Sequence, residues 1–209
     1  TQMRVVKIFQ DVMIEVKGVL EGKFKQRIGV HTFSQLYEWT NQSPHYSLQL
    51  VRWRAMGDSM LTLNTDGCSK GNLGESGGGG ILHDVSGLPI FAFSASFGMT
   101  SSIRAEVLAL GTGLRLCQQM GYAKVTIQVD SKVLVGILHR ELDCPWMVRR
   151  GVNQIEGMGV ESEQVTHCYR EANRVADCLA NVGVVAQGLG VTVYDKFSAM
   201  RGVVRVEVR

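Results

Sequence analysis

Residues 60–97 read MLTLNTDGCSKGNLGESGGGGILHDVSGLPIFAFSASF, and this stretch decides the fold. Its first seven residues alternate in character along the chain, which predicts a half-buried β-strand that ends at Asp66. A loop rich in glycine and polar residues is then expected over residues 67–80. The apolar segments 80–85 and 88–97 flank a short Ser-Gly turn, which is typical of a β-hairpin. The stretch therefore predicts three consecutive strands.

The rest of the chain predicts helices that alternate with strands. A helix is expected from Ser101 or Ser102 onward, because apolar side chains recur at spacings of three and four before Gly121, a candidate C-cap glycine. Residues 124–130 alternate like the first strand and end at Asp130. The remaining elements are expected as helical segments at 131–139 and 145–157, a short strand at 163–169 and a last helix at 170–181.

The last helix is expected to bury an apolar stripe and to carry an acid on its polar side. The stripe consists of Val175, Leu179 and Val182, and the acid is Asp177. The full order is three strands, a helix, a strand, a helical region, a strand and a helix. This order predicts an α/β fold with a mixed sheet, in which an antiparallel hairpin is followed by strands joined through helical crossovers.

The composition is that of an ordinary soluble globular protein, with 45% hydrophobic and 20% charged residues among 209. The formal net charge of +3 neither identifies nor excludes a nucleic-acid partner, because local basic patches matter more than the total. Five scattered cysteines without a CxxC pair disfavour a disulfide framework and a structural zinc site, and they favour free thiols in a reducing compartment. No apolar run approaches the roughly 18–20 residues of a membrane span, so no membrane partner is expected.

The length allows one substantial domain with appendages at its ends. Residues 4–24 carry apolar side chains at helical spacing, which indicates an amphipathic helix. We therefore expect an N-terminal helical extension and linker at 1–47, a compact domain at 48–185 and a C-terminal tail at 186–209. The N-terminal residues lack the pattern of a signal peptide, which favours the nucleus or the cytoplasm and leaves an organelle open. Because the chain begins at Thr1, a fragment or a processed form also stays open.

Four acids occupy positions from which their carboxylates can converge. Asp66 and Asp130 end two strands on the polar side, while Glu106 and Asp177 lie beside the apolar stripes of two helices. If the strands are neighbours and both helices pack on the same face of the sheet, the four carboxylates meet at one edge. The carboxylates of such a cluster repel one another unless divalent cations are bound between them. Two ions roughly 3.5–4 Å apart suffice for phosphodiester hydrolysis. The alternative is that each acid is simply solvated, as most are.

The local contexts of these acids resemble the motifs of a known family. Residues 64–72, NTDGCSKGN, resemble the first-strand motif of type 1 ribonucleases H, and residues 104–110, RAEVLAL, resemble the helix motif. Residues 128–131, QVDS, resemble the motif that ends the fourth strand, and residues 170–180, REANRVADCLA, resemble the closing motif. The resemblance covers residues 48–185 and is closest to the plant group, found in retroelement-derived and stand-alone proteins. Four motifs in the family's order make a strong signal, although each alone is weak.

The resemblance implies the ribonuclease H-like fold, a five-stranded mixed sheet flanked by helices. It implies that Asp66, Glu106, Asp130 and Asp177 bind two Mg²⁺ ions, with Mn²⁺ as a substitute. It further implies an endonuclease that hydrolyses the RNA strand of an RNA–DNA hybrid, and we expect a monomer that binds this hybrid. His167 lies ten residues before Asp177, the spacing of a mobile histidine in bacterial relatives, and a structural strand histidine is the alternative.

Candidate substrate contacts follow from the same resemblance and from charge. Four of them have small or polar side chains near the first aspartate or at the start of the first helix, and two are arginines on the helix after Pro145. They are Gly67, Cys68, Asn72, Ser102, Arg149 and Arg150. The two arginines equally fit a solvated helix face. Because the chain lacks the basic helical protrusion of bacterial and animal relatives, we expect weaker and more salt-sensitive binding.

Two other classes of function remain open on the sequence. A different enzyme on the same fold, such as an exonuclease, an integrase-like transferase or a junction resolvase, also uses clustered acids, and the fold alone does not decide between them. A catalytically silent, retroelement-derived nucleic-acid-binding domain is the second alternative. The presence of all four acids favours the enzyme over a decayed site.

Overall fold

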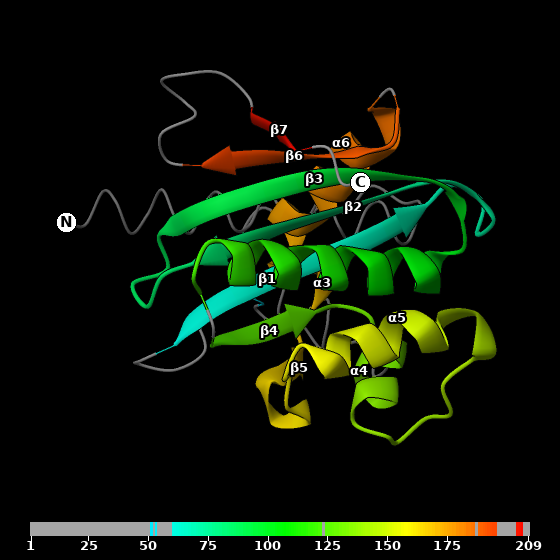
Figure 1. Cartoon of the computed structure of the whole chain (residues 1–209), viewed down its shortest axis with the longest axis horizontal. Coiled ribbons are helices and arrows are strands. Elements are labelled where there is room, and N and C mark those ends of the chain that lie inside the picture. The colour runs from blue at the N-terminus through cyan, green and yellow to red at the C-terminus, as the bar shows by residue number, and fades with distance from the viewer. Residues whose placement is uncertain are drawn as a thin grey trace, which may run out of the picture. The chain divides into compact units, whose positions relative to one another are not determined.

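The computed structural model describes residues 51, 53, 60–122, 124–186, 188–195 and 204–206. The helix expected at 4–24 lies outside these residues. The described part is an α/β structure in which helices cover both faces of a single sheet (Figure 1). In this part of the chain no helix combines the length and the apolar character needed to cross a membrane.

The sheet has seven strands in the order β5-β4-β1-β2-β3-β6-β7. The neighbours β1–β2, β2–β3, β3–β6 and β6–β7 pair antiparallel, whereas β1–β4 and β4–β5 pair parallel. The mixed sheet predicted from the order of elements is therefore confirmed. The strands are β1 (Leu61–Ser69), β2 (Gly74–His83), β3 (Pro89–Thr100), β4 (Val125–Val129), β5 (Val165–His167), β6 (Gly190–Asp195) and β7 (Val204–Val206).

All five expected strands are present, and two more come from the region expected to be a tail. β6 pairs with β3 from Ser96↔Gly190 to Phe91↔Asp195, and β7 pairs with β6. Without β6, β3 would end the sheet with a row of unpaired backbone N–H and C=O groups, which proteins usually cover. Residues 190–195 and 204–206 therefore extend the sheet.

The helices occur in the predicted order, but some elements begin or end at residues other than those predicted. The segment expected as the start of the last helix, residues 170–172, forms a separate 3₁₀ turn, and the strand expected at 163–169 pairs with β4 only over residues 165–167. The helices are α3 (Ser102–Gln119), α4 (Lys132–Leu138), α5 (Trp146–Gly157) and α6 (Arg174–Val185), and the 3₁₀ turns are η1 (Ser162–Gln164) and η2 (Arg170–Ala172).

The loop expected over residues 67–80 is confined to residues 70–73, because β1 continues past Asp66 to Ser69 and the glycine run 77–80 is part of β2. A Cβ atom on Gly77 or Gly79 would lie 2.5 or 2.3 Å from backbone atoms of α6, and one on Gly78 would lie 2.7 Å from the side chain of Ala109 in α3. Alternate glycines of β2 thus face α6 and α3, which lie on opposite faces of the sheet (Figure 1). The run is rich in glycine because a helix backbone approaches it closely.

The expected inner stripe of the last helix is wrong at two of its three positions, since only Leu179 is half-buried. Val175 and Val182 are 52% and 44% exposed, whereas the side of α6 that faces the sheet consists mainly of Ala176, Ala180 and Gly183. Small residues are required here because α6 lies almost in backbone contact with the sheet. A Cβ atom on Gly183 would lie 2.1 Å from the carbonyl oxygen of Ala95 in β3.

The strands that carry the two aspartates are buried on both faces, not half-buried as expected. On the α3 side, Leu63 and Ile127 belong to the main hydrophobic core. On the α6 side, Asn64 and Gln128 are almost completely buried. The alternation predicted for these strands is therefore real, but its polar side faces a helix instead of solvent.

Candidate metal centre

The first two acids lie side by side because their strands are parallel neighbours. Thr65 of β1 pairs with Val129 of β4, so Asp66 and Asp130 follow at the same level of the sheet. This confirms that the two strands are neighbours. Asp66 is 5% exposed and Asp130 is half-buried. Two carboxylates therefore lie at one edge of the sheet, largely removed from solvent.

Glu106 reaches the same place from the opposite face of the sheet. It lies in the second turn of α3, on the far side of the sheet from α6, so the condition that both helices share a face does not hold. Gly67 makes the approach possible, because a Cβ atom there would lie 2.2 Å from the backbone of Ala105 and of Glu106. The backbone N–H of Gly67 also donates to Glu106 Oε2 at 3.2 Å. Gly67 thus orients the third carboxylate.

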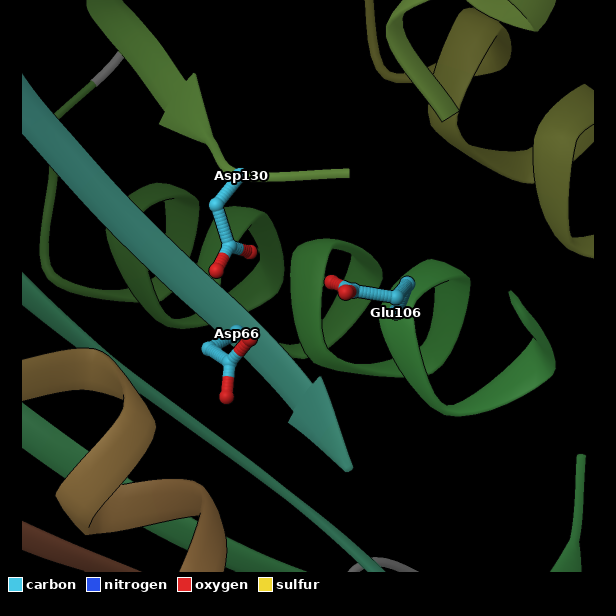
Figure 2. A group of neighbouring side chains, drawn as sticks. All are labelled: Asp66, Glu106 and Asp130. Carbon is cyan, nitrogen blue, oxygen red and sulfur yellow. The ribbon is translucent and has the colours of Figure 1, made fainter. Parts of the chain in front are cut away.

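Carboxylate oxygens of Asp66, Glu106 and Asp130 lie within 4.8 Å of one another. Figure 2 shows the three carboxyl groups directed toward a common space between β1, the end of β4 and α3. Among the residues that the structure describes, Asp130 Oδ1 is buried and has no hydrogen-bond partner. An orphaned buried oxygen among carboxylates fits a hard divalent cation, which prefers oxygen ligands.

The raised pKa values of two of these acids also favour a bound divalent cation. Burial, followed by the neighbouring Asp130, raises the pKa of Asp66 from 3.8 to about 7. Burial, followed by Asp66 and Asp130, raises the pKa of Glu106 from 4.5 to about 9. These acids resist ionisation in the absence of a counter-charge, and a bound dication would supply that charge.

Asp177, the fourth predicted acid, lies in the first turn of α6 and is not part of the three-acid group among the described residues. Its Oδ1 accepts a hydrogen bond of 2.9 Å from Nη2 of Arg170, and its side chain is 25% exposed. Its charge nevertheless contributes to the raised pKa of Asp66. Asp177 therefore borders the cluster from the α6 face.

Arg170 is a site residue that the sequence reasoning missed. Its guanidinium lowers the pKa of both Asp66 and Glu106, although burial and the other acids outweigh this effect. The hydrogen bond and the charge of Asp177 raise the pKa of Arg170 itself. In the sequence, Arg170 is only a basic residue seven positions before Asp177. The 3₁₀ turn η2 is what brings its side chain back onto that acid.

The predicted contacts near the first aspartate lie together at the end of β1 and the start of α3. Asn72 adopts a positive φ of 60°, and its Oδ1 accepts a hydrogen bond of 3.0 Å from the backbone N–H of Ser102. Asn72 thereby caps the helix that carries Glu106, whereas the side chain of the N-cap residue Ser101 forms no cap hydrogen bond. Burial, followed by the charge of Asp66, raises the pKa of the half-buried Cys68 thiol.

The other predicted contacts lie outside the three-acid group. His167 is in β5, where it pairs with Val129 of β4, and its ring packs edge-on against Tyr169 with ring centroids 5.8 Å apart. Its backbone is thus held by the sheet beside β4, the strand that Asp130 follows. Arg149 and Arg150 are exposed on α5, and Nη2 of Arg149 donates to the carbonyl oxygen of Cys144 at 3.1 Å.

Comparison with known proteins identifies the family of this chain. Residues 64–183 match the family described as reverse transcriptase-like. A protein of Arabidopsis thaliana, provisionally named as a ribonuclease H, is 31% identical over 150 residues, which is 64% of this chain. This chain spans 22% of the length of that protein.

Ribonucleases H1 are among the solved structures that share this fold. The enzyme of the archaeon Halobacterium salinarum is 23% identical with a TM-score of 0.56, and the match covers 60% of this chain and 98% of that one. LC11 ribonuclease H1, isolated from compost, was solved in complex with an RNA/DNA hybrid. In that complex it is 26% identical with a TM-score of 0.54, over 59% of this chain and 96% of that one. The chain therefore belongs to the reverse transcriptase-like family and has the ribonuclease H fold.

Proposed function

We propose that this chain is a metal-dependent ribonuclease H that cleaves the RNA strand of an RNA–DNA hybrid at internal positions. The observation that carries the proposal is the group of three carboxylates whose oxygens lie within 4.8 Å of one another. Membership of the family and the similarity to LC11 ribonuclease H1, solved with a hybrid, support the choice of substrate.

The carboxylates of Asp66, Glu106, Asp130 and Asp177 would hold Mg²⁺, with Mn²⁺ as a substitute. Two such ions supply an activated water on one side of the phosphorus and stabilise the leaving oxygen on the other. The hydrogen bond from Gly67 to Glu106 holds one ligand in place before the ions bind. Protons held by Asp66 and Glu106 in the metal-free protein would leave when the ions bind, because a bound dication offsets the burial and the neighbouring acids that raise the pKa values of both groups.

The RNA strand would be recognised by groups beside the carboxylates. Gly67 and Cys68 follow Asp66 directly, and Asn72 lies in the loop after β1. These residues present backbone and small or polar side chains, which suits contact with 2′-hydroxyl groups across a shallow minor groove. Because Oδ1 of Asn72 already accepts the N–H of Ser102, Asn72 would contact the hybrid as a donor through Nδ2. We assign His167, near the end of β4, to proton movement or product release.

Binding of the hybrid is expected to depend steeply on salt, because the contacts of Arg149 and Arg150 would be to phosphates. Replacing both arginines with glutamine should weaken binding and reduce the slope of log K against log salt by about 1–2. Fluorescence anisotropy in Ca²⁺, at several salt concentrations, measures this slope. Lys124→Gln, which removes a positive charge at the opposite end of β4, is the control. An unchanged slope in the double variant, or tight wild-type binding at high salt, would contradict the expectation.

The proposal is tested by offering the purified chain labelled RNA–DNA hybrid, single-stranded RNA, duplex RNA and duplex DNA, each with Mg²⁺, with Mn²⁺ or with EDTA. We expect internal cleavage of the hybrid RNA alone, and only with metal. Glu106→Gln, purified in parallel, excludes a contaminating nuclease and should be inactive. Hybrid binding without cleavage by the folded wild-type protein would instead favour a catalytically silent nucleic-acid-binding domain.

A further inference from the structure

A layer of three buried amide side chains lies directly beneath the carboxylates. Asn64, Gln128 and Asn173 are 2%, 6% and 1% exposed. Asn64 and Gln128 each precede an aspartate by two residues on a strand, and Asn173 precedes Asp177 by four residues, one helical turn. Because strand side chains repeat every two residues and helix side chains about every 3.6, each amide lies on the same face as the acid that follows it.

Hydrogen bonds join these amides across three elements of the fold. Nδ2 of Asn64 donates to Oε1 of Gln128 at 3.1 Å and to Oδ1 of Asn173 at 3.2 Å. Nδ2 of Asn173 donates to the backbone oxygen of Thr65 at 2.9 Å, and Nε1 of Trp53 donates to Oδ1 of Asn64 at 2.8 Å. The layer therefore ties β1 and β4 to the residue at which α6 begins.

The orientation of the two asparagine amides is determined by the indole N–H of Trp53 and the backbone carbonyl of Thr65, which lie at the two ends of this series of hydrogen bonds. An indole N–H can only donate, so Oδ1 of Asn64 faces Trp53 and its Nδ2 faces the other amides. A backbone carbonyl can only accept, so Nδ2 of Asn173 faces Thr65 and its Oδ1 faces Asn64. Both asparagines therefore have one orientation that satisfies their partners, and this makes the layer rigid.

The apolar face of α6 has few large side chains that could fix its position along the sheet. Its buried residues are Ala176, Ala180, Gly183 and Val184, and its backbone lies against Gly77 and Gly79 of β2 and Ala95 of β3. Small side chains permit a close approach but provide few interlocking projections, so they resist sliding and rotation poorly. Directional hydrogen bonds at Asn173 supply that restraint, one turn before Asp177.

We infer that Asn64 and Asn173 are positioning residues of the metal centre, because they set where Asp177 lies relative to Asp66 and Asp130. Neither residue is among the acids that would hold the ions or the groups that would contact the hybrid; both would act through the acids that follow them. The inference rests on the proposed function, since it concerns the same carboxylates. Groups that orient metal ligands contribute about 10- to 100-fold to metal affinity in other proteins, and we expect an effect of that size here.

The test measures Mn²⁺ affinity by calorimetry for the wild-type chain and for Asn173→Leu, which is similar in size but cannot form hydrogen bonds. Val184→Ala is the matched control, because Val184 is buried on α6 at the end far from Asp177. Both changes should lower the stability by about 1–3 kcal/mol. Only Asn173→Leu should weaken Mn²⁺ binding, by about 10- to 100-fold, at a temperature at which circular dichroism shows both variants folded.

Asn64→Leu is the second variant if Asn173→Leu does not fold, and it should weaken Mn²⁺ binding in the same way. In hybrid cleavage we expect both asparagine variants to lower kcat more than they raise KM, because the substrate contacts near Asn72 are left in place. Unchanged Mn²⁺ affinity in the folded asparagine variants, or an equal loss in Val184→Ala, would overturn the inference alone. A wild-type chain that binds neither Mn²⁺ nor Mg²⁺ would overturn the proposed function and this inference with it.

Discussion

Asp66→Asn is expected to lower metal-dependent cleavage of the hybrid at least about 1000-fold and, at the same time, to stabilise the metal-free protein. The loss of activity follows because the substitution removes the most buried carboxylate of the cluster, and metal stabilisation of the transition state amounts to several kcal/mol. The gain in stability follows because the same carboxylate is buried beside other acids. A residue that only supported the fold would not show these opposite effects.

The stabilising effect has a definite dependence on pH. The pKa of Asp66 is about 7 in the folded chain against 3.8 ordinarily, so the folded state holds the proton more tightly than the unfolded state does. Its stabilising contribution is complete below pH 3.8 and is lost as the pH rises through about 7. Glu106, with a pKa raised from 4.5 to about 9, shifts stability in the same direction over a higher range. The metal-free wild-type protein should therefore be more stable at pH 5 than at pH 8.

Denaturant unfolding in EDTA at pH 5 and pH 8 measures this difference. We expect Asp66→Asn to be more stable than the wild type by about 2–4 kcal/mol at pH 8 and by less at pH 5. Asp143→Asn, at an exposed acid between α4 and α5, is the control and should match the wild type. Added Mg²⁺ should stabilise the wild type more than Asp66→Asn. A variant that cleaves normally, or whose stability does not differ from the wild type at pH 8, would contradict the assigned site.

Gly79→Ala is expected to destabilise the fold by about 3 kcal/mol or more, although it adds a single methyl group. That methyl carbon would lie 2.3 Å from the backbone nitrogen of Ala180 and 2.5 Å from the carbonyl carbon of Leu179. Backbone atoms of a helix cannot move aside individually, so α6 as a whole must shift. Since α6 carries Asp177, we also expect weaker metal binding.

Gly157→Ala is the matched control for this substitution. Gly157 ends α5, and a Cβ atom there would meet no heavy atom within 4 Å in the described part of the chain. Alanine is favoured over glycine in a helix by up to about 1 kcal/mol, so this variant should equal or exceed the wild type in stability. Urea unfolding of the wild type, Gly79→Ala and Gly157→Ala measures these differences in the free energy of unfolding. A Gly79→Ala variant within about 0.5 kcal/mol of the wild type would mean that α6 does not lie against β2 as described.

The four acids could be predicted from the sequence because each lies in a recognisable local pattern. Asp66 and Asp130 stand at the last polar positions of two alternating segments, and the structure shows the strands β1 and β4 as parallel neighbours. Asp66, Glu106 and Asp130 converge as expected, and Asp177 lies at their border. The carboxylates converge although α3 and α6 pack on opposite faces of the sheet, because Gly67 lets Glu106 approach from the α3 side.

Arg170 and the amide layer could not be predicted in the same way. A buried asparagine on a strand looks, in sequence, like an exposed one, since alternation records only that a side chain is polar. Whether Asn64 meets solvent or Asn173 depends on a helix 109 residues away in the chain. The pairing of Arg170 with Asp177 likewise depends on a 3₁₀ turn where a continuous helix was expected.

By itself, the sequence determined the type and order of most elements, the mixed sheet and the identity of the acids. These properties follow from hydrophobic periodicity and from motifs, which depend on residues close together in the chain. Tertiary structure alone decided that the glycine run is a strand, that α6 buries alanines and exposes Val175, and that β6 and β7 extend the sheet. The physical reason is that close contact between two backbones selects small residues, so hydrophobicity no longer indicates which side is buried.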